Sequence, residues 1–431
     1  MKKRLLVFSA DALVYDDLEY LRTLPNFRRF LADGAVIKNV RSVYPTVTYP
    51  AHTTIATGAW PVTHGVATGN QIFSPGNLKP PWFWFHDAVK TADIFDAAKK
   101  RGYSTAAVFW PVTGNHPSID YLIDEYWTQG PEDTMEAAFG RTGSNPDMIE
   151  IIRNYFYKMT QRAHPSADYF VMNCVCDIIR RFKPEFFMLH PANIDGARHK
   201  YGLFNEKIYE SLDETDKWIG EIMDALDDAG VRKETNFFLI SDHGQMDIKR
   251  AVNINVLLAD NGLIRTDEKG GLADWDAYCF SAGMSAHVFL KDPGNMALCQ
   301  KTHKLLEHLC EEGVYGISRV FTKSEALREE NLGGDFSFVL ETDGYTAFGD
   351  DWRRPLVKSY DLSDYRFGRA THGYLPSRGP QPVLAAFGPD IRKGAVLENA
   401  RLVDLAPTFA KLLGADLPEA EGTAIEGILL S

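Results

Sequence analysis

The amino-acid sequence predicts an α/β fold in which a doubly wound, mainly parallel sheet carries helices on both faces. Five short apolar runs, each bounded by polar turn residues, are typical of strands that are buried on both sides. They lie at residues 4–9, 104–109, 185–190, 236–241 and 382–388. Segments with helical periodicity separate most of these runs. Repeated alternation of strand and helix is the pattern of a parallel sheet.

The predicted helices follow the strands along the chain. We expect helices over residues 91–101, 147–160 and 205–229. The third of these carries apolar side chains at spacings near 3.6 residues, which predicts one buried face: Ile208, Leu212, Ile219, Met223 and Leu226. A closing amphipathic helix is expected over residues 402–413, with Asp404 as its candidate N-cap.

Residues 255–364 differ in character from the rest of the chain. They contain mixed short apolar runs at residues 286–290 and 336–341, one clear helical stretch near residues 297–312, and several breaks with glycine. We interpret this region as an inserted α+β cap subdomain. Residues 1–254 and 365–431 would then form the core, and the insertion is expected to cover the functional site and set its substrate preference.

Composition excludes several classes of partner. At 431 residues the chain should hold two or three folding units. Its formal net charge of -12 offers no general attraction to a nucleic-acid polymer or an anionic membrane. It has no apolar run of the ~18 residues that a membrane anchor requires. The apolar run after Arg4 is only about four residues long, too short for a secretion signal, so we predict a cytoplasmic protein.

Acidic residues and histidines follow several of the predicted strands. Ligands of α/β proteins gather at the carboxyl ends of parallel strands. The relevant residues are Asp11, Asp195, His199, Asp242 and His243, and His372 lies in a loop before the strand at residue 382, near enough in sequence to fold over the same edge. Three aspartates and three histidines without sulfur suit zinc or a similar divalent ion, and they are too many for one site that keeps an open position. A site for two metal ions is the natural interpretation, because two ions can stabilise both the attacking and the leaving oxygen of a displacement at phosphorus.

Thr48 is the candidate nucleophile for such a site. It precedes Pro50, which suits the first turn of a helix because its missing N–H would be unpaired there in any case. The hydroxyl would then lie at the positive end of the helix, where a phosphate is favoured. A coordinated metal would lower the pKa of the hydroxyl. The structural alternative is that Thr48 is simply a helix N-cap.

At these residues the sequence resembles the alkaline phosphatase superfamily, and within it the nucleotide pyrophosphatase/phosphodiesterase family. The most diagnostic block is PTVTYPAH at residues 45–52, followed by TG at 57–58 and PVTHG at 61–65. The resemblance implies an alkaline-phosphatase-like core and two zinc ions. One ion would be bound by Asp195, His199 and His372, and the other by Asp11, Asp242, His243 and the hydroxyl of Thr48. It also implies that Thr48 attacks phosphorus and forms a covalent phosphothreonine intermediate.

Three further residues are candidates for substrate binding. Asn70 resembles an asparagine that holds a phosphate oxygen in the family. Tyr49 resembles an aromatic position that can stack on a base, although it could equally pack against the core at the start of the helix. Arg198 stands where the family usually has a glycine, so its guanidinium could bind a second anionic group of the substrate or pair with an aspartate. The tryptophan-rich run at residues 82–86 is interpreted as core, and His52, His64 and His190 as structural.

Together these features predict a two-zinc phosphodiesterase or nucleotide pyrophosphatase that acts on a small-molecule phosphodiester. The enzymatic alternatives are a phosphonate hydrolase of the phosphonoacetate hydrolase type and a phosphomonoesterase on the same core. The alternative outside enzymes is a metal-braced binding protein. The oligomeric state is left open.

Overall fold

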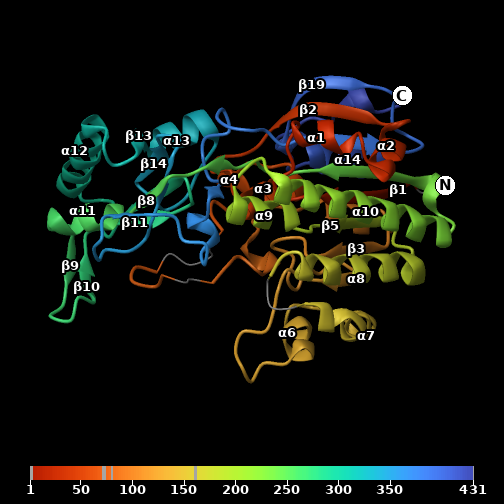
Figure 1. Ribbon diagram of the computed structural model, residues 1–431, viewed down its shortest axis with the longest axis horizontal. Helices are drawn as coiled ribbons and strands as arrows, with labels where there is room; N and C mark the ends of the chain where they lie inside the picture. The colour runs from red at the N-terminus through yellow and green to blue at the C-terminus, as the bar shows by residue number, and fades with distance from the viewer. Residues whose placement is uncertain (1–2, 70–73, 79–80, 160–162, 431) are drawn as a thin grey trace.

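An eight-stranded sheet organises the chain (Figure 1). The structure is a computed structural model that describes residues 3–69, 74–78, 81–159 and 163–430. In spatial order the strands are β19 (Val396–Arg401), β2 (Ala35–Arg41), β18 (Leu384–Phe387), β6 (Thr235–Ile240), β1 (Arg4–Ser9), β5 (Phe186–Leu189), β3 (Thr105–Val108) and β4 (Tyr121–Ile123). All five predicted strands belong to this sheet.

One of these five strands has the direction opposite to the predicted one. Strand β18 is antiparallel to both of its neighbours, β2 and β6, whereas the other neighbouring pairs are parallel. A parallel strand needs a crossover of a dozen or more residues, usually a helix, to return the chain to the opposite edge. The chain between His372 and β18 contains no helix, so β18 enters the sheet from the edge at which His372 lies.

Helices cover both faces of the sheet, as predicted (Figure 1). One apolar core includes residues of α1 (Asp17–Leu21), α2 (Pro25–Leu31), α6 (Met135–Arg141), α7 (Pro146–Tyr155), α8 (Ser166–Phe182) and α10 (Glu206–Asp228). The second core includes residues of α3 (Thr48–Thr57), α5 (Ile94–Lys100) and α14 (Leu405–Leu413). Strand β1 feeds both cores, because Leu6 and Phe8 point to the first and Leu5 and Val7 to the second. This two-sided burial explains why its sequence is continuously apolar.

The predicted helices are present, with one local difference. Helices α5, α7, α10 and α14 lie within or close to the predicted ranges. Asp404 immediately precedes α14, but its carboxylate does not cap that helix. Instead it accepts hydrogen bonds from the side chain of Arg401 and from the backbone N–H of Thr423.

A second, four-stranded antiparallel sheet lies beside the main sheet, at the left of Figure 1. Its order is β11 (Ala277–Ser281), β12 (Ser285–Leu290), β14 (Phe338–Thr342) and β13 (Ile317–Thr322). Helices α11 (Ile254–Asp260), α12 (Met296–Glu312) and α13 (Lys323–Glu330) and the hairpin of β9 (Ile264–Thr266) and β10 (Leu272–Trp275) accompany it. The division of the chain into a core and an inserted cap remains a prediction.

Two small sheets complete the described structure. Strand β8 (Arg250–Val252) pairs with β15 (Thr346–Phe348) and β16 (Val357–Lys358), and β7 (Met246–Asp247) pairs with β17 (Ala370–Thr371). Among the helices in the described part of the chain, none is both long enough and apolar enough to cross a bilayer.

Candidate metal centre

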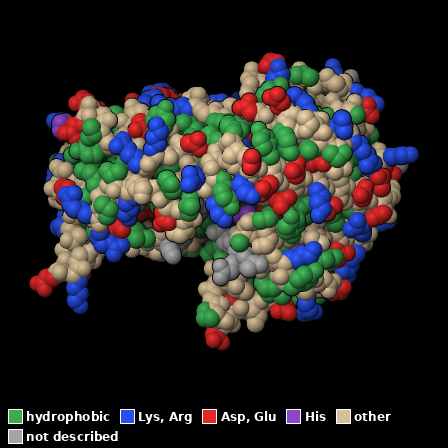
Figure 2. Space-filling view, in the orientation of Figure 1, with side chains coloured by type: hydrophobic (Ala, Val, Ile, Leu, Met, Phe, Trp, Pro, Cys, Tyr) green, Lys and Arg blue, Asp and Glu red, His purple; other side chains and the backbone are tan. Residues whose placement is uncertain are grey.

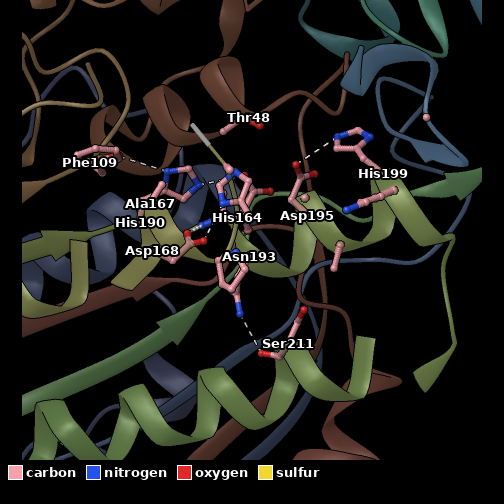
Figure 3. Close-up of a pocket in the computed structure, with 18 of the residues that line it drawn as sticks. Thr48, Phe109, His164, Ala167, Asp168, His190, Asn193, Asp195, His199 and Ser211 are labelled. Atoms are coloured by element: carbon pink, nitrogen blue, oxygen red, sulfur yellow. Dashed lines mark hydrogen bonds and ion pairs between the residues drawn. The ribbon is translucent and has the colours of Figure 1, made fainter. Parts of the chain in front are cut away.

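The six aspartates and histidines singled out in the sequence meet at the carboxyl edge of the main sheet. Asp11 lies two residues beyond β1, and Asp242 and His243 follow β6. Helix α9 (Asn193–Tyr201), which follows β5, carries Asp195 and His199, and His372 directly follows β17. Figure 3 shows Thr48, Asp195, His199 and His190 around a common cavity. The six residues form two groups of three, each with its possible ligand atoms within 4.8 Å of one another.

The first group consists of Asp11, Asp242 and His243. Nε2 of His243 lies 3.2 Å from Oδ2 of Asp242 and 3.6 Å from Oδ1 of Asp11. The hydroxyl oxygen of Thr48 lies 3.0 Å from the same nitrogen. Ligand atoms at about 2.0 Å from a tetrahedral zinc ion are about 3.3 Å apart, so these spacings suit a shared ion.

The second group consists of Asp195, His199 and His372. The spacing of four residues on α9 places Asp195 and His199 on one face of the helix, and Nε2 of His199 lies 3.2 Å from Oδ2 of Asp195. Nε2 of His372 lies 4.0 Å from Oδ1 of Asp195. The rings of His243 and His372 have centroids 4.2 Å apart, so the two groups adjoin.

The electrostatics of the first group favour a cation. Oδ1 of Asp11 and Oδ2 of Asp242 are buried and have no hydrogen-bond donor among the described residues. Burial, together with the neighbouring carboxylates of Asp195 and Asp242, raises the pKa of Asp11 well above its usual value, and burial raises the pKa of Asp242 to about 6. Buried oxygens without a partner are costly, and a divalent ion would satisfy them and compensate their charge. Burial also lowers the pKa of His243 to about 4, which keeps the imidazole neutral, as a metal ligand must be.

Asp195, in the second group, responds differently. Burial alone would raise the pKa of Asp195, but the imidazoles of His199 and His372 outweigh burial and hold this pKa below its usual value. The carboxylate is therefore ionised near neutral pH and available as a ligand.

Hydrogen bonds to the backbone orient two of the histidines. Nδ1–H of His199 donates to the carbonyl of Ala370 at 2.8 Å, and Nδ1–H of His243 donates to the carbonyl of Gly244 at 3.2 Å. A neutral imidazole carries one proton, so each bond leaves Nε2 unprotonated, with its lone pair on the side of its group. Both rings are thus held in the tautomer that a metal site needs.

Two histidines that were expected to be structural, and a glutamine that was not singled out from the sequence, contact residues of the site. Nε2 of His190 lies 3.0 Å from Oδ2 of Asp11, and Nδ1–H of His52 donates to the backbone carbonyl of Thr48 at 2.9 Å. The side-chain amide of Gln245 donates to Asp195. The positions of the two histidines in the sequence could have indicated this role, because His190 immediately follows β5 and His52 lies one helical turn after Thr48. His64 has a structural partner, the hydroxyl of Thr54 at 3.0 Å.

Thr48 is the first residue of α3, and Val47 occupies the N-cap position without a side-chain bond to the helix. The alternative in which Thr48 serves as N-cap is therefore not what the structure has. The first helical hydrogen bond runs from the N–H of Ala51 to the carbonyl of Val47. The preceding N–H groups of α3 have no carbonyl acceptor within the helix and lie at its positive end.

A cavity of about 790 Å³ opens over the two groups. Thr48, Asp11, Asp195, His199 and His372 lie in its wall. Figure 3 shows further lining residues from α8 and α10, among them Asp168 and Ser211. Of the described residues between 255 and 364, the cavity wall includes Leu362, Ser363 and Asp364 and none from the four-stranded sheet. The insertion thus reaches the cavity through residues 362–364, and its role in covering the site and setting substrate preference remains a prediction.

Aromatic side chains form one side of the cavity. Tyr49 is buried in the wall, and the ring of Trp82 packs edge-on against it with centroids 5.3 Å apart. Trp127 continues this wall, edge-on to Trp82 at 5.7 Å. Trp82 also packs against the small apolar core cluster of Tyr49, Val66 and Val112, so it contacts the core, as expected, and lines the cavity as well.

The two other substrate-binding candidates have different outcomes. Arg198 is buried and points away from the cavity lining: its guanidinium donates to both oxygens of Asp17, at 2.6 and 2.8 Å, and to the carbonyl of Ala12. This geometry favours the pairing with an aspartate. The expected contact with a substrate anion was wrong, because the guanidinium already donates to Asp17 and Ala12. Asn70 lies outside the described residues.

Comparisons with known proteins show which proteins the chain resembles. The family model of type I phosphodiesterase/nucleotide pyrophosphatase matches residues 5–374. Ectonucleotide pyrophosphatase/phosphodiesterase family member 1 of Homo sapiens is 27% identical over 273 residues, which are 59% of this chain and 25% of that protein. Ectonucleotide pyrophosphatase/phosphodiesterase 1 of Saccharomyces cerevisiae is 25% identical over 409 residues, 89% of this chain and 52% of that protein. The matches thus span between a quarter and about half of these relatives.

The solved structures support the fold. Murine ectonucleotide pyrophosphatase/phosphodiesterase 5 superimposes with a TM-score of 0.68 at 16% identity, and the alignment covers 100% of both chains. That structure is an inactive threonine-to-alanine variant in complex with AMP. A second structure of the same murine protein gives a TM-score of 0.67 at 18% identity.

Proposed function

Because the chain belongs to the type I phosphodiesterase/nucleotide pyrophosphatase family of the alkaline phosphatase superfamily, we propose that it hydrolyses phosphodiester or phosphoanhydride bonds at the Thr48 site. The proposal includes two divalent metal ions, zinc in preference to others, and a covalent intermediate on Thr48. One ion would be held by Asp195, His199 and His372. The other would be held by Asp11, Asp242, His243 and Thr48.

The observation that carries the proposal is the place of the Thr48 hydroxyl, 3.0 Å from Nε2 of His243 at the start of α3. Its oxygen attacks phosphorus and gives up its proton, a P–O bond to Thr48 forms, and the bond to the leaving group breaks, so that the leaving oxygen can take up that proton. Water then attacks the phosphoryl group, and the Thr48 oxygen leaves and regains a proton. The N–H groups of the first turn of α3 face the phosphoryl oxygens during both steps. Two bound divalent ions supply positive charge for the attacking and leaving oxygens.

The aromatic wall supports nucleotides as the substrate class. Trp82 and Trp127, which are partly exposed, offer flat apolar surfaces in the cavity that Thr48 lines, and stacking on a base contributes about 1–3 kcal/mol in other proteins. The murine relative was solved with AMP, a nucleotide, which is consistent with this choice.

The test is hydrolysis of bis(p-nitrophenyl) phosphate by the zinc-loaded protein, before and after chelation and in the Thr48→Ala variant. We expect activity that both treatments abolish, with metal content measured beside activity. Full activity in Thr48→Ala would contradict the mechanism, and no hydrolysis of any ester would favour a metal-braced binding protein. A panel of dinucleotides, nucleoside triphosphates, phosphonoacetate and p-nitrophenyl phosphate distinguishes the phosphodiesterase from the phosphonate hydrolase and the phosphomonoesterase.

A further inference from the structure

Glu341 is a fully buried carboxylate on β14 of the four-stranded sheet, and it contacts two loops of the metal centre at once. Oε2 accepts a hydrogen bond of 2.9 Å from the hydroxyl of Tyr44, and Oε1 accepts one of 3.1 Å from the N–H of Leu375. Tyr44 lies four residues before Thr48. Leu375 lies three residues after His372. One side chain outside the cavity therefore bridges the segment of the nucleophile and the segment of a metal ligand.

The two segments are also joined directly, between Glu341 and the site. The hydroxyl of Thr46 donates to the carbonyl of Tyr374 at 2.9 Å, and the N–H of Gly373 donates to the carbonyl of Thr46 at 2.9 Å. Thr46 and Gly373 are each close neighbours of a proposed functional residue. The hydrogen bonds of Glu341 to Tyr44 and Leu375 join the same two segments a second time, further from the metal centre.

The turn between β11 and β12 packs against the loop that contains His372. The N–H of Met284 donates to the carbonyl of His372 at 2.9 Å. Gly373 has a φ of +102°, and a Cβ at this position would lie 1.8 Å from the carbonyl oxygen of Ala282. The loop of His372 is therefore fitted closely against the four-stranded sheet, and only a glycine allows this approach.

A carboxylate is an expensive way to join two loops. Burying it costs free energy that hydrogen bonds only partly return, and the nearest cation, Nη1 of Arg378, is 3.9 Å from Oε1 on a half-buried side chain. An apolar side chain would stabilise the same position at lower cost but could not accept from both donors. The geometry of the two loops is what the carboxylate secures.

We propose that Glu341 is a positioning residue, which fixes Thr48 and His372 relative to each other through Tyr44 and Leu375. The proposal rests on the proposed function of Thr48 and extends it to the four-stranded sheet. That sheet then serves as a brace for the site. Displacement of a reacting group by about 1 Å can cost about a hundredfold in rate.

The experiment compares Glu341→Ala, Glu341→Gln and Tyr44→Phe with a control, Leu340→Ala. Leu340 precedes Glu341 on β14 but packs into the separate apolar core of the four-stranded sheet, so its truncation weakens the sheet without removing a bond to either loop. Each variant is assayed below its unfolding temperature for kcat and KM on bis(p-nitrophenyl) phosphate. Hydrogen exchange is measured by mass spectrometry on peptides that contain residues 44–48 and 372–375.

We expect kcat of Glu341→Ala to fall about a hundredfold while KM changes less than about threefold. Glu341→Gln keeps one acceptor for Leu375 and should recover part of the loss. Tyr44→Phe combined with Glu341→Ala should be no slower than Glu341→Ala alone, because both changes break the same connection. Amide exchange should accelerate in both loop peptides of Glu341→Ala and in neither peptide of Leu340→Ala.

Three results would overturn the proposal: unchanged kcat in folded Glu341→Ala, an equal loss of kcat in Leu340→Ala, or unchanged exchange in the two loops. Should Glu341→Ala fail to fold, Glu341→Gln and Tyr44→Phe carry the same comparison. An inactive wild-type protein would contradict the proposed function alone, because the exchange measurement still decides whether Glu341 holds the loops.

Discussion

The hydroxyl oxygen of Thr48 lies 3.0 Å from Nε2 of His243, although 195 positions separate the two residues in the sequence. Helix α3 begins at the sheet edge where β6 ends, and this brings a helix N-terminus and a strand end together. The hydroxyl is only half-buried, so it faces both the cavity and the ligand group. In this arrangement the hydroxyl oxygen of Thr48 can act both as the nucleophile and as a metal ligand.

Replacement of Thr48 by alanine should remove activity without removing the metal ions. We expect a loss on the order of 10³-fold or more, because the residue that forms the covalent bond is gone. Thr48→Ser should retain much of the rate, since it keeps the hydroxyl. Thr57→Ala, at the other end of α3, is the control, because the Thr57 hydroxyl donates within the helix at 2.7 Å. Kinetics are paired with metal analysis, and loss of metal in Thr48→Ala would leave the nucleophile unproven.

Removal of the metal ions should lower stability as well as activity. Ions that bind the folded state at a concentration a thousandfold above Kd contribute about 4 kcal/mol, so the chelated protein should melt at a lower temperature and recover when zinc is added. Asp242→Asn should show a smaller zinc-dependent shift. If the melting temperature of the wild type is indifferent to zinc and chelator, the two groups do not bind the ion.

Breaking the pair of Arg198 and Asp17 should cost stability and leave substrate affinity unchanged. Removal of one partner of a buried ion pair typically costs about 3–5 kcal/mol, because the other charge is left without compensation. We therefore expect Arg198→Met to lower the free energy of unfolding by about this amount, measured in urea. Combined with Asp17→Leu, the loss should be smaller than for Arg198→Met alone. A large rise in KM with an unchanged free energy of unfolding would mean instead that Arg198 contacts the substrate.

The aromatic wall should distinguish esters with a base from those without one. Trp82→Ala should raise KM for the p-nitrophenyl ester of thymidine monophosphate about tenfold, since stacking on a base contributes about 1–3 kcal/mol. Methyl p-nitrophenyl phosphate lacks a base and is the matched control substrate. Equal effects on the two esters would mean that Trp82 supports the fold of the wall and not the base.

Five of the six metal-binding candidates could be placed because they follow parallel strands, which deliver their carboxyl ends to one edge, whereas His372 precedes β18 and lies at that edge because β18 is antiparallel. The direction of β18 could not be read from its apolar run, because burial on both faces is the same for parallel and antiparallel strands. The partner of Arg198 and the place of Trp82 depend on contacts with Asp17 and Trp127, distant in sequence. Glu341 carried no local signal at all, since its donors, Tyr44 and Leu375, come from two remote loops.

The burial of Glu341 should appear as a pH dependence of stability. Burial raises the pKa of Glu341 from 4.5 to about 7, although the N–H of Leu375 and the hydroxyl of Tyr44 favour the ionised form. Arg378 also lowers this pKa, and Glu330 raises it. The folded protein therefore holds the proton more tightly than the unfolded chain.

The sign follows from linkage. Between pH 4.5 and 7 the folded state binds more protons at this group than the unfolded state, so its contribution to stability falls as pH rises through that window. Glu341→Gln removes the titration and keeps the shape of the side chain. We expect the wild type to lose stability relative to Glu341→Gln between about pH 5 and pH 8 in urea unfolding, because all other titrations cancel in the difference. A difference that stays constant across this range would mean that Glu341 titrates in the folded protein as it does in the unfolded chain.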